Sequence, residues 1–373
     1  MYNNTVGFPA RFDGLRHDDG IREHMDAAVI AIGFGEPDEP DRDAVEAYLE
    51  RIFFENMDIE DDVPAKAASE RAQTLARRRA PGLLEEYEAI GGSPLGEHLV
   101  AHVDRLQAEL ERRGMAVRTH VGTQFYQPTI EQAVEETAAV HPSTVAILPM
   151  YPLCGPSTTV KAIGATAEAI DAYDDWDPST IPIGGWHRHQ LYNRLRAENL
   201  MTVLNERGVT LHDDDTELVF SAHGTPVSYL EAGSRYDRYV EEYCEAQAAL
   251  LGVSSYTLGY QNHGSRGVEW TQPDLEDAIE MIDATRLVVE PISFIHEQSE
   301  TLFELEVELA DEAAELGKEV VRIPIPHDDE RLAAVLADLV EPAVAGFNDE
   351  YYGFRPCQCS NTPGTRCLCA PLS

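Results

Sequence analysis

Short apolar runs alternate with amphipathic stretches along almost the whole chain, and this alternation limits the fold more than any other feature. Eight runs have the length and aliphatic content of buried strands. They are Ala27–Gly33, Ala116–Gly122, Thr144–Met150, Thr180–Gly184, Glu217–Ala222, Ser255–Tyr260, Arg286–Ile292 and Val320–Ile325. The stretches with a 3.6-residue apolar period are Asp43–Phe53, Leu95–Arg113, Ile130–Ala139, Thr159–Ala172, Leu191–Asn205, Tyr236–Leu251, Glu300–Leu316 and Asp329–Leu339. Strands that alternate with helices predict an α/β fold whose parallel sheets are covered by helices on both faces.

The strand–helix–strand–helix order occurs twice, and the two halves meet near a turn at Tyr173–Pro178. We therefore expect two similar doubly wound domains, residues 27–173 and 174–340, whose parallel sheets face a central cleft. Residues 1–26 are expected to form a flexible N-terminal extension, and residues 341–373 a cysteine-rich tail. The sequence does not distinguish a monomer from a homodimer.

The chain has a strongly acidic composition. Its 373 residues include 67 acidic and 28 basic ones, which give a formal net charge of −39. Such a charge repels nucleic acids and anionic lipids, so we expect neither as a partner. A solvated, salt-adapted surface, as in a halophilic protein, is the preferred interpretation. No apolar run approaches the ~18 residues of a membrane span, and residues 1–26 lack a hydrophobic signal segment, so we expect a cytoplasmic protein without a stable membrane anchor.

One histidine stands where open α/β sheets usually bind their ligands. Residues Leu218, Val219 and Phe220 belong to a predicted strand, and the glycine directly after His223 helps to end it. His223 therefore lies at the carboxyl edge of a sheet. A neutral imidazole there can accept a proton or bind a metal ion, although a histidine satisfied by local hydrogen bonds is the structural alternative.

A row of carboxylates follows 77 residues later in the chain. Glu300, Glu304 and Glu308 are spaced i, i+4, i+8, which stacks their side chains on one face of a helix. Carboxylates opposite an imidazole can bind a divalent cation. The structural alternative is a solvated helix face in a very acidic protein.

At this point the chain resembles a known family, the ferrochelatases, which insert ferrous iron into a porphyrin in haem synthesis. The resemblance covers about residues 27–339, and its motifs follow the order found in the family. The motifs are Gly33-Phe-Gly-Glu-Pro37, Gly91-Gly-Ser-Pro-Leu95, Tyr151-Pro152, Ser157-Thr-Thr159, Ser221-Ala-His-Gly224, Gly233-Ser-Arg-Tyr236, Tyr260-Gln261 and Glu300-Thr-Leu302. Each motif alone is weak, and their shared order makes the resemblance specific.

The resemblance implies both the substrates and the reacting residues. His223 and Glu300 match the essential pair at the porphyrin centre, and the row through Glu304 and Glu308 matches a path to an outer metal position. The expected substrates are Fe²⁺ and a porphyrin, either coproporphyrin III or protoporphyrin IX. Which of the pair binds iron and which removes the two pyrrole protons stays open.

Further residues are candidates for porphyrin binding by the same resemblance. They are Phe34, Ser157, Thr158, Trp186, Arg188, Tyr229 and Arg235. The two arginines can pair with porphyrin propionates, because guanidinium binds carboxylate through two hydrogen bonds. Lone arginines are more often surface residues, and the hydroxyls of Ser157 and Thr158 can cap a helix as readily as they receive an anion. Phe34 stands where some members have a tyrosine, so it offers no axial oxygen ligand.

Four of the six cysteines lie close together in the tail: Cys357, Cys359, Cys367 and Cys369. The tail lacks apolar periodicity, so core packing does not explain them, and clustered thiolates favour zinc or an iron–sulfur cluster. Many ferrochelatases hold a [2Fe–2S] cluster on one internal and three C-terminal cysteines, and Cys154 lies two positions before that internal residue. Two ligand sets stay open, Cys154 with three tail cysteines or all four tail cysteines, and zinc is the alternative metal.

Two other functions remain possible from the sequence. One is a chelatase that inserts cobalt or nickel into another tetrapyrrole, although such enzymes are usually shorter and depend on two or more histidines. The other is a porphyrin or haem carrier without catalysis. A carrier needs an axial ligand but no carboxylate opposite it, so a Glu300→Gln substitution separates it from an enzyme.

Overall fold

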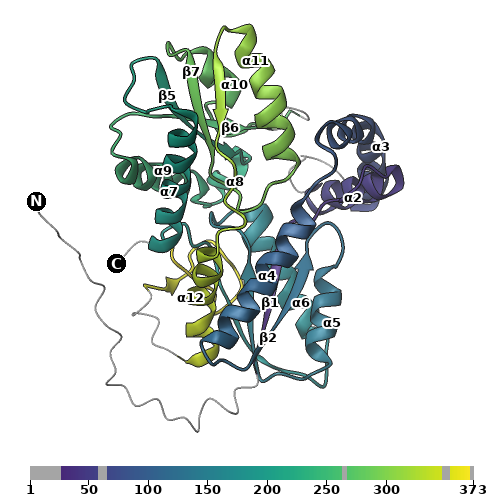
Figure 1. Ribbon diagram of the computed structural model, residues 1–373. Coiled ribbons are helices and arrows are strands. Elements are labelled where there is room, and N and C mark those ends of the chain that lie inside the picture. Colours follow the sequence, from purple (N-terminus) through teal and green to yellow (C-terminus); the bar gives the residue numbers. More distant parts are fainter. Residues whose placement is uncertain (1–26, 58–64, 263–266, 347–352, 370–373) are drawn as a thin grey trace, which may run out of the picture.

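Two four-stranded parallel sheets form the framework of the protein (Figure 1). The computed structural model describes residues 27–57, 65–262, 267–346 and 353–369. The first sheet has the order β2-β1-β3-β4, with β1 Ala27–Gly33, β2 Val117–Thr123, β3 Thr144–Pro149 and β4 Ser179–Pro182. The second has the order β6-β5-β7-β8, with β5 Thr216–His223, β6 Thr257–Gln261, β7 Arg286–Pro291 and β8 Glu319–Arg322.

The two sheets have the same topology, which confirms the predicted pair of doubly wound halves. In each half the first strand lies second in its sheet, and every strand pair is parallel. All eight predicted strands are present, with small shifts at their ends. β4 pairs with β3 in the first sheet, so that sheet continues to Pro182, past the division expected between residues 173 and 174.

Helices cover both faces of the sheets, as the apolar periodicity predicts. They are α2 Arg42–Glu55, α3 Ala65–Ile90, α4 Leu95–Arg112, α5 Ile130–Ala138, α6 Lys161–Asp171, α7 Gln190–Arg207, α8 Val227–Glu231, α9 Tyr236–Leu251, α10 Leu275–Glu280, α11 Leu309–Glu315 and α12 Arg331–Ala345. The last helix, α12, follows the second sheet in sequence but returns to the first half and packs against α4 (Figure 1). This return ties the two halves together.

The expected helices Thr159–Ala172 and Glu300–Leu316 both begin in π-helical segments: η2, Pro156–Val160, and η3, Glu300–Glu308. π-helical segments are rare and often occur at functional sites. η3 continues into α11, and it carries Glu300, Glu304 and Glu308. The expected row of carboxylates is therefore built on a π-helix.

Helix α3 was not predicted from the sequence, and it packs against α2 and η3 (Figure 1). Its buried residues are mostly small, with an alanine on every fourth position from Ala68 to Ala80 followed by Leu83 and Tyr87. Alanine gives a weak apolar signal, and Pro81 lies inside the helix, where it normally indicates a break. These two features hid a helix that covers part of the site described below.

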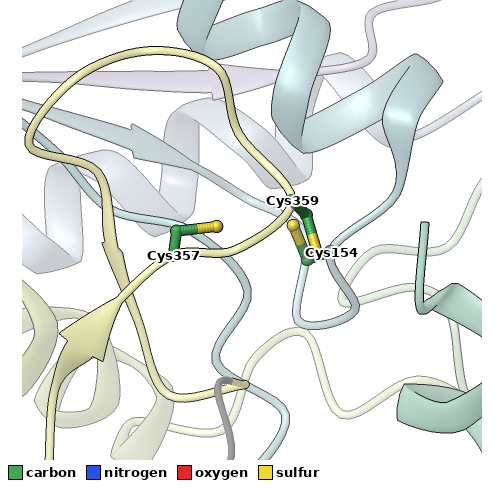
Figure 2. Close-up of side chains that lie close together, drawn as sticks. All are labelled: Cys154, Cys357 and Cys359. Carbon is green, nitrogen blue, oxygen red and sulfur yellow. The ribbon is translucent and has the colours of Figure 1, made fainter. Parts of the chain in front are cut away.

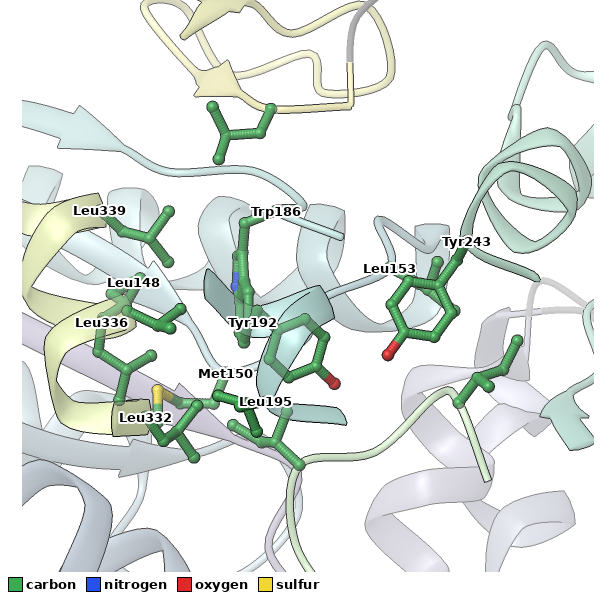
Figure 3. Close-up of a cluster of buried hydrophobic side chains, with 14 of the residues drawn as sticks. Leu148, Met150, Leu153, Trp186, Tyr192, Leu195, Tyr243, Leu332, Leu336 and Leu339 are labelled. Carbon is green, nitrogen blue, oxygen red and sulfur yellow. The ribbon is translucent and has the colours of Figure 1, made fainter. Parts of the chain in front are cut away.

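The largest core cluster extends from the first sheet to α7, α9 and α12. Figure 3 shows Trp186 in the middle of this cluster, between Leu339, Leu148 and Tyr192. Trp186 is fully buried and stacks edge-on against Tyr192, with ring centroids 4.9 Å apart. The prediction that Trp186 lines a porphyrin cleft is therefore wrong, because its ring fills the core.

The described part of the tail is bound to the end of the first sheet. A short hairpin of β9 Arg355–Pro356 and β10 Arg366–Cys367 lies beside the segment that follows β4. The Gly184 amide donates to the Arg366 carbonyl (2.5 Å), and the Leu368 amide donates to the Gly185 carbonyl (3.0 Å). The predicted flexible extension, residues 1–26, lies outside the described residues.

Candidate active site

His223 is the last residue of β5, at the carboxyl edge of the second sheet, as predicted. Its backbone is held on both sides, because its amide donates to Ser293 Oγ (2.8 Å) and its carbonyl accepts from the Tyr236 hydroxyl (2.9 Å). Its ring Nδ1 lies 2.6 Å from the Gly224 carbonyl oxygen. A carbonyl only accepts, so Nδ1 carries the proton and Nε2 is the nitrogen that can take one up.

Glu300 lies opposite this nitrogen. Its Oε1 is 3.9 Å from His223 Nε2, and the side chains keep 18% and 31% of their exposure, respectively. The rings of Trp270 and Phe294 stand edge-on to the imidazole, with centroids 6.5 and 6.4 Å away. The structure thus brings together the two residues singled out by the sequence, between aromatic walls.

Burial acts on both members of the pair and favours their uncharged forms. It lowers the pKa of His223, and the hydrogen bond to the Gly224 carbonyl only partly offsets this effect. It raises the pKa of Glu300 well above the ordinary value, and the nearby Glu304 and Glu36 carboxyls add to the effect. A cation that arrived here would meet oxygen and nitrogen ligands that are only partly exposed to solvent.

The carboxylate row runs from the pair of His223 and Glu300 to the surface. Glu300 and Glu304 are partly buried, whereas Glu308 is exposed. Gln261 Nε2 links the first two, because it donates to Glu304 Oε2 (2.8 Å) and to the Glu300 carbonyl (3.2 Å). Burial is the main reason why the pKa of Glu304 rises to about 7. The row therefore offers a chain of oxygen ligands between solvent and His223.

Two residues that sequence reasoning missed come from helix α3. Arg79 pairs with Glu86 (2.7 Å). Burial raises the pKa of Glu86, and the nearby charge of Glu308 adds to this rise. The charge of Glu86 in turn helps to raise the pKa of Glu304. Both belong to the helix that was not predicted, so no sequence signal assigned them to the row. A third missed residue is Glu36, in the Gly33-Phe-Gly-Glu-Pro37 motif, where only the motif as a whole was recognised.

Several predicted porphyrin contacts lie in the first half. The Phe34 ring packs on Phe125, with centroids 4.6 Å apart. Ser157 and Thr158 lie in η2, where Gln124 Nε2 donates to the Ser157 carbonyl (3.1 Å). Their backbone, rather than their hydroxyls, makes this contact, and the Thr158 hydroxyl donates at 3.5 Å to the Gly155 carbonyl as a weak local cap.

The remaining predicted residues lie nearer the tail. Arg188 makes a two-pronged ion pair with Glu242, with its Nη2 2.7 Å from Oε1 and its Nε 3.0 Å from Oε2. Tyr229 is half-buried in the short helix α8, and Arg235 is exposed at the start of α9. Arg188 is therefore already paired with a carboxylate of the protein, which makes it less available to a porphyrin propionate.

Cysteines form a second cluster, at the junction of the tail and the first sheet. The sulfurs of Cys154, Cys357 and Cys359 all lie within 4.8 Å of one another, close enough to hold one metal centre (Figure 2). Cys154 comes from the loop after β3, and the other two come from the tail. Hydrogen bonding with Cys154 and Cys359 lowers the pKa of the Cys357 thiol. The arrangement includes the internal cysteine, as the first of the two predicted ligand sets requires.

The other two tail cysteines flank this group. Cys367 lies within hydrogen-bonding range of Cys357 and Cys369. The Cys369 sulfur is 3.2 Å from His187 Nδ1, whose Nε2 is 3.1 Å from Glu242. All six cysteines of the chain are free thiols.

Glycines allow the tail to approach this closely. A Cβ on Gly185 would lie 2.5 Å from the Cys369 sulfur and 2.8 Å from the Cys154 Cβ. A Cβ on the preceding Gly184 would lie 2.8 Å from the Cys367 Cβ. Only residues without side chains fit at these two positions, and no sequence signal had pointed to them.

A cavity of about 430 Å³ lies beside the cysteines, not at His223. Cys369, Tyr239, Glu242 and Arg235 are among its lining residues. We place the candidate active site at His223 and Glu300 despite this, because an imidazole and a carboxylate face each other there, next to the row of carboxylates. No helix in the described part of the chain is long and apolar enough to span a bilayer.

The chain is similar to several known proteins. The family model for ferrochelatases matches residues 26–344. A ferrochelatase of Synechococcus elongatus is 34% identical over 271 residues, which cover 69% of this chain and 67% of that protein. A ferrochelatase of Aquifex aeolicus is 30% identical over 325 residues, or 86% of this chain and 100% of that protein. The solved structure of CbiX, described as the terminal enzyme for siroheme biosynthesis in denitrifying bacteria, aligns at 14% identity and a TM-score of 0.46 over 85% of this chain and 99% of that one.

Proposed function

The chain belongs to the ferrochelatase family, whose members insert ferrous iron into a porphyrin in haem synthesis, and we propose that His223 and Glu300 carry out this reaction. The observation that carries the proposal is the distance of 3.9 Å between His223 Nε2 and the Glu300 carboxyl, both of them partly buried. The two groups supply the base and the oxygen ligand that metal insertion requires.

Insertion of Fe²⁺ releases two protons from the pyrrole nitrogens of the porphyrin. His223 is suited to accept one of them, because its Nδ1 proton is held by the Gly224 carbonyl and Nε2 can take up another. Glu300 lies on the same side and offers an oxygen to the incoming iron. Trp270 and Phe294 restrict the space around the imidazole, which favours a flat aromatic ligand.

Iron reaches this pair along the carboxylate row in our proposal. Glu308 is exposed, Glu304 is partly buried and hydrogen-bonded to Gln261, and Glu300 faces His223. Fe²⁺ prefers oxygen and imidazole ligands, so successive carboxylates can replace its water shell in steps. Glu86 of helix α3 lies near the outer part of this row and belongs to the same route.

The remaining porphyrin contacts are proposed for Phe34, Ser157, Thr158, Tyr229 and Arg235. Their support is their position in motifs shared with the family, and Arg235 is also exposed and able to meet a propionate. Coproporphyrin III and protoporphyrin IX both remain candidate substrates. Clustered cysteines that serve as metal ligands rather than as disulfides favour a reducing compartment, so we propose that the enzyme is cytoplasmic.

A [2Fe–2S] cluster is the second part of the proposal. Cys154, Cys357 and Cys359 would hold it, with Cys367 or Cys369 as the fourth ligand, and the close sulfurs and the flanking glycines fit such a group. When bound, the cluster would supply thiolate-ligated iron that joins the tail to the first sheet. Zinc is the alternative, and absorption between about 300 and 600 nm together with acid-labile sulfide distinguishes the two.

An anaerobic insertion assay in high salt tests the main proposal. Wild-type protein receives Fe²⁺, Co²⁺ or Zn²⁺ with coproporphyrin III, protoporphyrin IX or sirohydrochlorin in turn, and visible absorption follows insertion. We expect iron insertion into one of the first two porphyrins. His223→Ala and Glu300→Gln should lower turnover by roughly 10²- to 10⁴-fold while porphyrin binding persists.

Glu306→Gln is the matched control, because Glu306 lies on the same π-helix but pairs with Arg322 (2.5 Å). This variant should keep wild-type turnover. Tight porphyrin binding without insertion of any metal by the wild type would show a carrier instead. Insertion of cobalt into sirohydrochlorin alone would show a different chelatase.

A further inference from the structure

Glu36 is a buried carboxylate in the loop after β1, and the reaction proposed above does not use it. Only 3% of the residue is exposed. Both of its oxygens are used: the Ser93 hydroxyl and the Ser299 amide (3.1 Å) donate to Oε1, and the Tyr87 hydroxyl (3.0 Å) and the Ser299 hydroxyl (2.8 Å) donate to Oε2. Four donors on one side chain fix its position closely.

The four donors come from both halves of the protein. Tyr87 lies in α3, and Ser93 lies in the loop before α4, both in the first half. Ser299 lies in the second half, in the segment between β7 and η3. Its amide and its hydroxyl both bind the same carboxylate, so Glu36 joins the β1 loop to the start of η3 across the two sheets.

Ser299 immediately precedes Glu300, the first residue of η3. A shift of Ser299 therefore moves Glu300 with respect to His223, whose own backbone is held by Ser293 and Tyr236. The two members of the pair are thus fixed from different directions. His223 is held within the second half, and Glu300 is also held from the first.

The chemistry of this contact is unusual for a purely structural one. All four donors are uncharged, and burying a carboxylate without a cation is costly. A buried glutamine with the same hydrogen bonds to one oxygen would cost less. A carboxylate has two acceptor oxygens, whereas a glutamine amide has one. Glu36 can therefore accept from the amide and from the hydroxyl of Ser299 at the same time.

We propose that Glu36 is a positioning residue for iron insertion, which holds Ser299 across the cleft so that Glu300 faces His223. This inference rests on the proposed function. Glu36 does not contact the metal or the porphyrin in this proposal, and it acts through the residue before Glu300. Its removal should therefore affect the chemical step more than the binding of the porphyrin.

Three variants test this assignment in the full chain. Glu36→Gln keeps the size of the side chain but replaces one acceptor oxygen with a donor, and Ser299→Ala removes the hydroxyl that crosses the cleft. Tyr87→Phe is the matched control, because it removes a hydrogen bond to the same carboxylate from within the first half. The readouts are kcat, KM for each substrate, porphyrin affinity measured by absorbance, and Tm.

We expect Glu36→Gln and Ser299→Ala to lower kcat by about ten- to a hundredfold, the effect of misplacing a reacting group by about 1 Å, at an unchanged porphyrin affinity. Tyr87→Phe leaves both contacts between Glu36 and Ser299 in place, so it should lower kcat clearly less than the other two variants. The inference is overturned if Glu36→Gln and Ser299→Ala both keep the wild-type kcat. It is also overturned if all three variants lose the same factor in kcat and the same number of degrees in Tm, because Glu36 would then be a general structural residue. If the wild type inserts no iron into any porphyrin, the proposed function fails, and this outcome is recognised before any variant is measured.

Discussion

A cluster of four histidines between the two halves predicts that acid destabilises the protein. His98 and His102 lie on α4, and His296 and His327 lie in the loops after β7 and β8. The His98 and His327 rings stack with centroids 3.6 Å apart, and those of His102 and His296 are 4.9 Å apart. His102 is 2% exposed and donates from Nε2 to the His327 carbonyl (2.6 Å). Its Nδ1 has no partner among the described residues.

Burial is the main reason why the pKa of His102 falls from 6.5 to about 4. Arg105, His98 and His327 lower it further by their charges, and only the hydrogen bond to the His327 carbonyl raises it. The unfolded chain therefore binds more protons than the folded protein between pH 6.5 and 4, so stability falls as the pH falls through this window. For His102 alone, the loss reaches at most about 3.4 kcal/mol below pH 4, and roughly 2 kcal/mol of it has occurred by pH 5.

Urea unfolding at pH 8, 6 and 5 and constant salt measures this loss. Buried carboxyl groups with a raised pKa, such as Glu290 and Glu300, act in the opposite direction, so the test compares variants rather than the wild-type curve alone. His102→Gln should lose about 2 kcal/mol less than the wild type between pH 8 and 5. His212→Gln, at an exposed position, is the control and should follow the wild type within about 0.5 kcal/mol. If His102→Gln loses as much stability as the wild type, burial of a neutral His102 is not the cause.

Three further predictions concern the tail, the core and the surface. Gly185→Ala should reduce bound metal and acid-labile sulfide, because its Cβ would lie 2.5 Å from the Cys369 sulfur. Gly164→Ala is the control and should not reduce them, because its Cβ would have nothing within 4 Å. Equal metal content in both variants would contradict the close packing at Gly185. Arg196→Met should destabilise the protein by about 3–5 kcal/mol in urea unfolding, because it leaves Glu290, which is 1% exposed, without its ion-pair partner. Arg194→Met is the control. It breaks only an exposed pair with Glu198 and should cost less than about 1 kcal/mol. With a net charge of −39, Tm should rise in ~1 M KCl, where the screening length is about 3 Å, and sorbitol of equal osmolality should not reproduce the rise if charge repulsion is its cause.

The strands and the pair at the cleft could be predicted because their signals are local. β1 consists of seven buried residues in a row, and His223 directly precedes a glycine at the end of β5. In a parallel sheet these two features place the side chain at the ligand-binding edge. Glu300 needed one step more, since its role was inferred from its motif and from the spacing of the row.

The sequence did not predict side-chain environments that depend on distant parts of the chain. Trp186 and Arg188 are neighbours in one segment that resembles a cleft motif, but Trp186 fills the core and Arg188 pairs with Glu242, 54 residues further along. The buried face of α3 consists mainly of alanine, which is too weakly apolar to show a helix by periodicity. Glu36 has partners 51, 57 and 263 residues away, so no short pattern could have indicated its contacts.

The two halves have matching topologies but place different residues at the ends of their equivalent strands. His223 ends β5 and Glu300 follows the loop after β7, so the pair is assembled by the central strands of the second half alone. The equivalent strands of the first half, β1 and β3, lead instead to Glu36 and Cys154. The first half therefore contributes no member of the pair, and it acts on Glu300 through Ser299 and covers the carboxylate row with α3. Changes in the first half at Glu36 should alter the rate of insertion, whereas changes at Cys154 should alter the attachment of the tail and leave the geometry of His223 and Glu300 intact.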